Sequence, residues 1–198
     1  PKTIQSAARL SIRGAIYEET LVPAWRVRAL KWFGVSAAQF DLLTKEHFKN
    51  FLLAMPRGVG LQVLRTWAFA WVTSARFHDT TRLPCCLGCV GAKDAQAHYL
   101  RCPLLWGPIP LLSGHPVPPE PGSRAAFSLS FGDAHNLAIV TNAYHTVRRR
   151  ASWRLNAEHG LFAENLLIWQ RHLVASRNRF ADISYDGVPR SSMKLYLT

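Results

Sequence analysis

Apolar residues in the first third of the chain are spaced as in helices. Between Pro23 and Gly34, the segment 24–33 has the start and stop residues typical of a helix. Ser36 follows as a candidate N-cap for a stretch that ends before Pro56. The apolar residues of that stretch are Phe40, Leu43, Phe48, Phe51 and Leu52. Their spacing predicts either two short helices or one interrupted helix.

A longer helix is predicted from about Gly60. Apolar residues repeat there at intervals of three and four along a single face. That stripe consists of Leu61, Leu64, Ala68, Trp71 and Ala75. Val63, Trp67 and Ala70 lie off the stripe. We therefore expect this helix to be packed on two sides.

The last third of the chain predicts two further helices. Asp133 is a candidate N-cap for the first, and a break is expected around Asn156 before the second. The two apolar stripes are Leu137, Val140, Tyr144 and Val147, and then Phe162, Leu166, Trp169 and Leu173. The tail from Asp182 carries turn residues and is expected to be irregular. Because strand signals are few, the sequence predicts a mainly α fold that ends in a C-terminal helical pair.

The cysteines lie close together in the sequence, and one histidine follows them. Two residues separate Cys86 from Cys89, and three separate His98 from Cys102. A short loop with a glycine lets two sulfurs converge on one ion, and a four-residue step places two ligands one helical turn apart on one face. Cys85 would also close the loop with Cys89, so the first ligand is either Cys85 or Cys86.

Three thiolates and one imidazole are the soft ligand set of tetrahedral Zn²⁺. We therefore predict a small CCHC zinc-bound insert, with Asp94 as a candidate cap for the turn that carries its last two ligands. Four protein ligands close the coordination sphere, so one structural Zn²⁺ is expected rather than a catalytic one. The clustering of cysteines also favours metal over disulfides and an intracellular reducing compartment, either nucleus and cytoplasm or an organelle matrix.

Pro- and Gly-rich stretches divide the chain into four parts. An N-terminal helical region covers residues 1–81, and the CCHC zinc-binding module covers 82–106. A Pro/Gly-rich connector follows at 107–123. Residues 124–198 form a C-terminal basic helical region. The expected architecture is a helical domain that carries a small zinc-bound insert.

The charge of the chain indicates its class of partner. Of its 198 residues, 48% are hydrophobic, which indicates a folded core, and 24 Lys and Arg against 12 Asp and Glu give a net charge of +12. Arginine outnumbers lysine 18 to 6, and guanidinium suits bidentate phosphate contacts. No run approaches the roughly 20 apolar residues of a membrane span. Nucleic acid, either RNA or DNA and bound mainly through phosphate, is therefore the expected partner.

Two groups of arginines are candidates for phosphate contact. The first belongs to the C-terminal region, and the second lies beside Trp25 and Trp32. The candidates are Arg148, Arg149, Arg150, Arg154 and Arg171 in the first group, and Arg26 and Arg28 in the second. Cations at the C-terminal end of a helix also favour the helix dipole and solubility, so this interpretation stays open beside phosphate contact.

Motifs for catalysis are missing from the sequence. It contains no Tyr-x-Asp-Asp, no Gly-rich phosphate loop and no His-Glu-x-x-His. The acidic residues are scattered and do not form the paired carboxylates of two-metal chemistry. We therefore predict that the chain is not an enzyme.

The cysteine-rich segment resembles a known family. Trp71 and His78 precede Leu-Pro-Cys-Cys-Leu-Gly-Cys, and His-Tyr-Leu-Arg-Cys-Pro-x2-Trp follows. This order, over residues 67–106, resembles the zinc-binding CCHC region downstream of the polymerase domain in reverse transcriptases of non-LTR retrotransposons. The resemblance implies a module that holds template RNA or target DNA. The chain departs from the family in the three residues between His98 and Cys102, where many members have four.

Two functional hypotheses follow. The leading one is a non-catalytic, zinc-stabilised nucleic-acid-binding protein, derived from or cut out of a retroelement reverse transcriptase; the chain begins at Pro1 without a Met, which fits a fragment or processed product. The alternative is a domesticated structural subunit of a large assembly, such as an organellar ribosome or a membrane-associated complex, in which contacts with protein subunits dominate. Salt-dependent nucleic-acid binding by the isolated chain would distinguish them.

Overall fold

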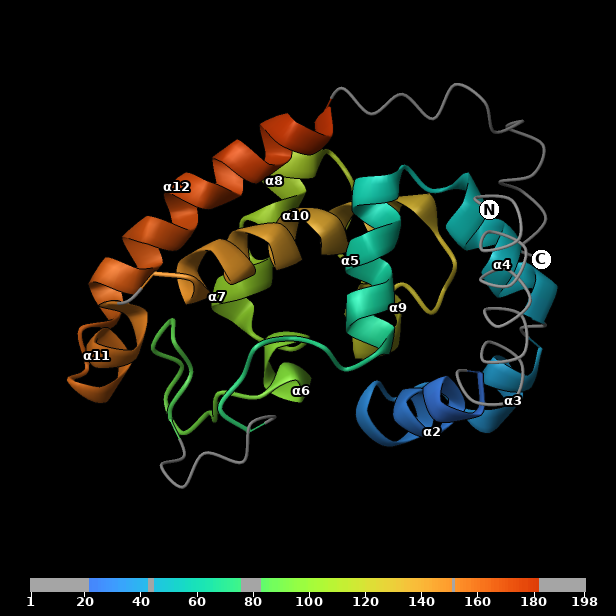
Figure 1. Ribbon diagram of the computed structural model, residues 1–198, viewed down its shortest axis with the longest axis horizontal. Helices are drawn as coiled ribbons and strands as arrows, with labels where there is room; N and C mark the ends of the chain where they lie inside the picture. The colour runs from blue at the N-terminus through green and yellow to red at the C-terminus, as the bar shows by residue number, and fades with distance from the viewer. Residues whose placement is uncertain (1–21, 43–44, 76–82, 151, 182–198) are drawn as a thin grey trace, which may run out of the picture.

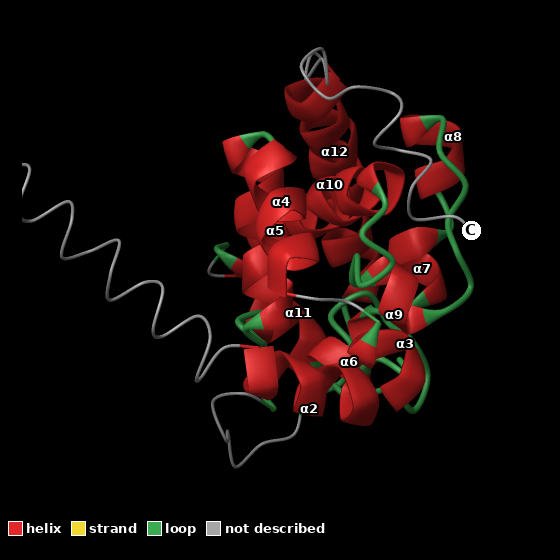
Figure 2. Cartoon of the chain, turned by 90° about the vertical axis from the view of Figure 1, so that its right-hand side faces the viewer, coloured by secondary structure: helices red, strands yellow, loops and turns green. Residues whose placement is uncertain are grey.

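The computed structural model describes residues 22–42, 45–75, 83–150 and 152–181. These residues form helices and loops without a β-strand, apart from one isolated bridge between Pro84 and Lys93, which confirms the mainly α class (Figure 2). The helices are α2 (Val22–Trp32), α3 (Ala37–Asp41), α4 (Lys45–Ala54), α5 (Arg57–Trp67), α6 (Gln96–Tyr99), α7 (Pro103–Trp106), α8 (Ile109–Ser113), α9 (Pro121–Arg124), α10 (Phe131–Arg148), α11 (Ser152–Glu158) and α12 (Phe162–Ala181).

Helix α10 lies in the middle of the molecule. It packs most extensively on α12, which forms the C-terminal helical pair with it, and next on α5 (Figure 1). Its predicted stripe of Leu137, Val140, Tyr144 and Val147 is buried. Ala138, Ile139 and Ala143, which lie off that stripe, are buried as well. Helix α10 is therefore covered on several sides, and it supplies the scaffold on which the cysteine-rich loop is fixed.

The ends of the C-terminal helices differ from the prediction. Ser130, not Asp133, is the N-cap of α10, because the Ser130 side chain accepts a hydrogen bond from the Asp133 N–H. Asn156 lies inside α11 rather than at a break. The turn before α12 instead contains Gly160, whose φ of +72° is in the left-handed region that glycine tolerates best. The tail from Asp182 lies outside the described residues.

Helix α5 is shorter than predicted. It ends at Trp67 in a Schellman motif, in which Phe69 adopts a left-handed φ of 56°. The Ala70 N–H donates to the Arg65 carbonyl at 2.8 Å, and the Phe69 N–H donates to the Thr66 carbonyl at 3.0 Å. The prediction that one helix continues to Ala75 was therefore wrong. Glycine usually occupies the position of Phe69, so the sequence carried no stop signal there.

The buried face of α5 also differs from the predicted stripe. Leu61 and Leu64 are exposed at 46% and 38%, whereas Val59, Val63 and Trp67 are fully buried. The residues placed off the stripe thus form the core side of the helix. Because the helix ends at Trp67, the following segment turns back. Trp71 therefore lies outside the helix and is still fully buried.

The first helices agree with the sequence. Helix α2 covers nearly the predicted segment, and Ser36 caps α3 in a capping box with Gln39. Of the two alternatives for the following stretch, the structure has two short helices, α3 and α4. Leu43 lies outside the described residues. The predicted connector, 107–123, is partly helical, because α8 lies within it and α9 begins within it.

An aromatic core fills the space between α2, α4 and α5. The Trp67 ring lies 5.0 Å from Trp25, 5.3 Å from Phe48 and 5.2 Å from Phe127, measured between ring centroids. Its indole Nε1 donates to the Ala125 carbonyl at 2.8 Å. The buried Trp67 therefore has its polar atom satisfied as well as its apolar surface covered.

Candidate metal centre

Four side chains of the cysteine-rich segment converge on one point. The ligand atoms of Cys85, Cys89, His98 and Cys102 all lie within 4.8 Å of one another. The sulfurs of Cys89 and Cys102 are 3.4 Å apart. Of the two possible first ligands, the structure selects Cys85 and excludes Cys86 from the cluster. A CCHC group is therefore assembled as the sequence predicted, with a Cys-x3-Cys pair at its start.

The chain brings the first two cysteines together in a tight hairpin turn. The Cys85 N–H donates to the Ala92 carbonyl at 2.8 Å, and the Asp94 N–H donates to the Leu83 carbonyl at 2.9 Å. Between these bonds, Gly88 has a φ of +90°. The glycine permits the reversal that turns the sulfurs of Cys85 and Cys89 inward.

The last two ligands are held differently from the prediction. His98 belongs to the short helix α6, but that helix ends at Tyr99, and Cys102 is the N-cap of α7. The two ligands thus come from the junction of two short helices rather than from one helical turn. Pro103 at the first position of α7 favours a new helix start at this point.

The cluster fits a tetrahedral metal ion. Ligands at about 2.0–2.3 Å from Zn²⁺ lie about 3.3–3.8 Å from one another, so small inward movements would close the site around an ion. The Nε2 atom of His98 is buried and has no hydrogen-bond partner among the described residues. A buried nitrogen without a partner is costly, and a bound cation would satisfy it.

The thiols differ in how easily they ionise. A hydrogen bond from Cys102 lowers the pKa of Cys85 to about 4, and burial opposes this shift. The same hydrogen bond and burial raise the pKa of Cys102. Burial raises the pKa of Cys89. Cys85 is therefore the thiol that ionises first, and a cation that binds all three sulfurs must release protons from the other two.

Cys86 faces the protein interior instead of the cluster. Its thiol is buried, and burial raises its pKa to about 12. Its backbone N–H donates to the Tyr99 hydroxyl at 3.1 Å, and its carbonyl accepts from the Asn165 amide at 3.0 Å. Cys86 therefore ties the ligand loop, defined as the segment 83–106 that carries the four ligands, to α12 through its backbone, while its neutral thiol packs as a small apolar group.

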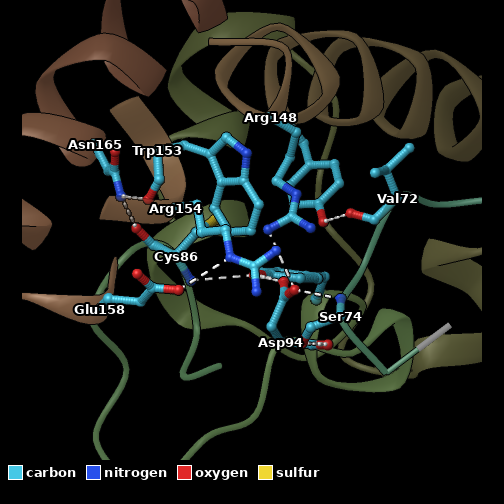
Figure 3. Close-up of polar contacts among 11 residues, drawn as sticks. Val72, Ser74, Cys86, Asp94, Arg148, Trp153, Arg154, Glu158 and Asn165 are labelled. Atoms are coloured by element: carbon cyan, nitrogen blue, oxygen red, sulfur yellow. Dashed lines mark hydrogen bonds and ion pairs between the residues drawn. The ribbon is translucent and has the colours of Figure 1, made fainter. Parts of the chain in front are cut away.

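A buried carboxylate fastens the ligand loop to the body (Figure 3). Asp94 is fully buried; its Oδ2 accepts from the Ser74 N–H at 2.6 Å and its Oδ1 from the Tyr99 hydroxyl at 2.6 Å. Burial raises the pKa of Tyr99, so its hydroxyl keeps the proton that it donates. Asp94 therefore does not cap α6, whose N-cap is Ala95; it joins three segments of the chain.

Arg148 is the counter-ion of this carboxylate. Its Nη1 lies 3.2 Å from Asp94 Oδ2, at ion-pair distance although outside hydrogen-bond geometry, and both side chains are almost fully buried. The guanidinium carbon lies 3.2 Å from the ring centre of Trp153, and Figure 3 labels both side chains. Arg148 was predicted to contact phosphate; that assignment is corrected, because its side chain is only 3% exposed.

Several other predicted arginines have partners within the chain. Arg26 forms a bidentate ion pair with Asp41, at 2.7 and 2.9 Å. Arg154 pairs with Glu158 at 3.0 Å. Arg28 donates to the Trp67 carbonyl at 3.2 Å. These contacts give each guanidinium a local role.

The remaining predicted arginines lie at the surface. Arg149, Arg150 and Arg171 are exposed, and none has an acidic partner among the residues that the structure describes. Arg150 Nη2 lies 3.3 Å from Nε2 of His172, the neighbour of Arg171 on α12. The C-terminal end of α10 and the adjoining part of α12 thus carry cationic charge that the described side chains do not neutralise.

Sequence reasoning missed the groups that surround the ligands. Asp94 was recognised only as a candidate cap, and Tyr99 and Trp153 were not singled out. Their roles depend on contacts with Ser74 and with α10, which are distant in the sequence. The one available signal was that Asp94 stands between the two ligand pairs.

Comparisons with known proteins give no relative for this chain. No family model, no curated protein and no solved structure matches it. Within the described residues, none of the helices has both the length and the apolar character that crossing a bilayer demands. Its function is therefore inferred from the candidate site and the surface around it.

Proposed function

We propose that Cys85, Cys89, His98 and Cys102 hold one structural Zn²⁺. Three sulfurs and an imidazole match the ligand preference of zinc, and four protein ligands leave no position for an activated water. The ion would order the segment that carries the four ligands. Such a thiol-rich site is suited to a reducing intracellular compartment. Metal analysis of freshly purified, reduced protein should find about one zinc per chain, and a protein without zinc would contradict this proposal.

We further propose that the chain is a non-catalytic protein that binds RNA or DNA through phosphate. The observation that carries this proposal is the exposed group of Arg149, Arg150 and Arg171, which lacks acidic partners among the described residues. Unpaired guanidinium groups on a chain of net charge +12 attract polyanions and release their counterions on contact.

The likeness to a retroelement reverse transcriptase belongs to this proposal as well. Its support is the order of the cysteines and histidine, and the helices on both sides of the ligand segment. His78, which contributes to the likeness, lies outside the described residues. On this proposal the zinc-ordered loop sits beside an arginine surface, as in a module that holds nucleic acid next to a polymerase.

The nucleic-acid proposal is tested by Arg150→Ala combined with Arg171→Ala. Binding of unrelated RNA and DNA oligonucleotides should weaken to a similar degree, because phosphate contacts carry no base information. The slope of log affinity against log salt should flatten by about 1.4–1.8 units, at about 0.7–0.9 for each lost phosphate contact. The melting temperature should stay nearly unchanged, because both side chains are exposed.

A matched control removes the same charge elsewhere. Arg26→Ala with Arg154→Ala deletes two arginines that already pair with carboxylates. This control should leave the salt slope near that of the unaltered protein. An equal effect of both double variants would mean that only net charge matters. An unchanged slope in the first variant would assign the arginines to solubility or to a protein partner.

The structural-subunit alternative has one observation in its favour. Leu61 and Leu64 on α5, together with Leu53 on α4, are exposed large apolar side chains. Leu61 and Leu64 lie three residues apart on one helix, and exposed apolar side chains that form one patch are typical of protein contacts. We propose a structural subunit of a large assembly as the second function. Recovery of the chain only within a stoichiometric complex, without nucleic-acid binding by the isolated chain, would support it.

A further inference from the structure

A small pocket opens where α5 and α10 both end. Its volume is about 210 Å³. Its lining residues come from the last turn of α5, the segment that follows it, and the C-terminal end of α10: Arg65, Ala70, Val72, His145, Arg148 and Arg149. Among the described residues the lining includes three guanidinium groups and an imidazole but no carboxylate, and of the three guanidinium groups Arg148 is already paired with Asp94. A pocket of this composition is electrostatically complementary to an anion.

One buried group of the pocket lining has no polar partner. His145 is only 8% exposed, and its buried Nε2 makes no hydrogen bond within the described chain. Arg148 differs, because its guanidinium pairs with Asp94 and stacks on Trp153. The carbonyl ends of the two helices favour cations nearby, but they do not satisfy the imidazole. Buried polar atoms normally have partners, so a ligand is expected to supply one to His145.

The local field at His145 is strongly positive. Burial first, and then Arg65, Arg149 and Arg148, lower the pKa of its imidazole to about 4. At neutral pH the ring is therefore uncharged, and its neighbours repel a further proton. A bound anion would offset that repulsion and move the pKa of His145 back towards its ordinary value of 6.5.

We propose that this pocket binds a phosphate group, held by Arg65 and Arg149 at its mouth and by His145 at its wall. Guanidinium suits tetrahedral oxyanions because its donors can form paired hydrogen bonds to two oxygens. The inference deepens the proposed function: if the chain binds nucleic acid, a backbone phosphate is the occupant. If it does not, the same chemistry takes free phosphate or a phosphomonoester.

The pocket is tested by titrating the zinc-loaded chain with inorganic phosphate at constant ionic strength, balanced with chloride. The ring signals of His145, assigned by their loss in His145→Gln, should shift saturably, and the pKa of His145 should rise. Arg65→Gln should weaken phosphate binding about tenfold or more, because one charge-assisted hydrogen bond to the ligand is lost. Arg65 has no side-chain partner in the described structure, so this variant should keep its zinc and its fold.

Arg179→Gln is the matched control, because it removes the same charge at an exposed position outside both the pocket and the surface proposed to bind nucleic acid. It should change phosphate affinity by less than about twofold, since the exposed charge is screened. The proposal would be overturned if the ring signals of His145 showed no saturable shift, or if both variants weakened phosphate binding equally. A short oligonucleotide that displaces phosphate identifies a backbone phosphate as occupant. Saturable phosphate binding without such displacement keeps the pocket and counts against the nucleic-acid proposal alone.

Discussion

The aromatic core and the ligand loop are stabilised by opposite means. Around Trp67, aromatic rings from α2 and α4 and from the segment after α9 pack on one another, and a single hydrogen bond satisfies the indole. Around Cys85 and His98, the chain relies on convergent ligands, and a buried ion pair lies behind them. The first region buries apolar surface, and the second buries polar groups that must find partners.

Because the two regions are stabilised differently, different solution conditions should unfold each of them. Apolar packing is insensitive to metal chelators and to mild acid, because it contains few ionisable groups. The ligand loop depends on deprotonated thiols that bind the metal, so loss of metal and low pH both weaken it, while the Asp94–Arg148 pair joins it to α10. We therefore expect a substitution that unfolds one region to leave the other region folded.

The largest effect is expected from loss of a metal ligand. Cys89→Ser should abolish zinc binding, whose apparent free energy is on the order of 10 kcal/mol in small structural sites, and should unfold the segment from 83 to 106. Hydrogen exchange by mass spectrometry should show lost protection there and retained protection around Trp67. Cys86→Ser is the control and should keep its zinc. Equal loss of protection in both regions would show that they unfold as one unit.

A comparable loss of stability without loss of metal is expected in the aromatic core. Trp67→Ala removes the ring contacts and the hydrogen bond to Ala125, so the free energy of unfolding should fall by about 3–5 kcal/mol. Denaturant unfolding measures this change, and metal analysis of the folded fraction should still find one zinc. Loss of zinc in this variant would contradict the separation of the two regions.

The ion pair behind the loop is expected to contribute slightly less. Asp94→Asn keeps an oxygen for the Ser74 N–H but leaves Arg148 without its counter-ion, which should cost about 3 kcal/mol. Arg148→Met in the same chain should recover much of that loss, because the buried charge is then gone. A double-mutant cycle measures the coupling. Strictly additive losses would show that the two side chains do not interact.

The smallest effect concerns the glycines of the ligand loop. Gly88 has a φ of +90°, and an added Cβ would lie 2.8 Å from Phe162 Cβ on α12. Gly88→Ala should therefore cost about 1–2 kcal/mol for the backbone and more for the clash, and it should weaken zinc affinity. Gly91 also has a positive φ, of +68°, but nothing lies within 4 Å of its added Cβ. Gly91→Ala should show the backbone cost alone, and equal losses would argue against the contact with α12.

Local patterns predicted those parts of the molecule whose causes are local. The ligand spacing, the stripe of α10 and the N-cap at Ser36 each depend on residues near one another in the sequence. The stop at Phe69 was missed because a bulky residue occupies a left-handed position that usually holds glycine. The choice of Cys85 was open because both cysteines could close the loop.

The burial of Arg148 could not be read from the sequence, because its place in a run of three arginines is typical of an exposed helix end. Only the fold brings it against Asp94 and Trp153, which come from different segments. The sequence therefore identified the charged residues of this helix end but not which of them are exposed. Of the three arginines in that run, Arg149 and Arg150 stay exposed.

The Asp94–Arg148 pair also has an evolutionary consequence. Loss of either partner leaves a buried charge without a counter-ion. Replacement of both by well-packed neutral residues can leave the free energy of unfolding nearly unchanged. In any lineage that shares this fold, the two positions are therefore expected to vary together, and a homologue with one changed should carry a compensating change at the other. Arg149, which has no such tie, should drift independently unless phosphate selects it. Paired changes at these two positions among homologues would therefore be evidence for the contact that joins the ligand loop to α10.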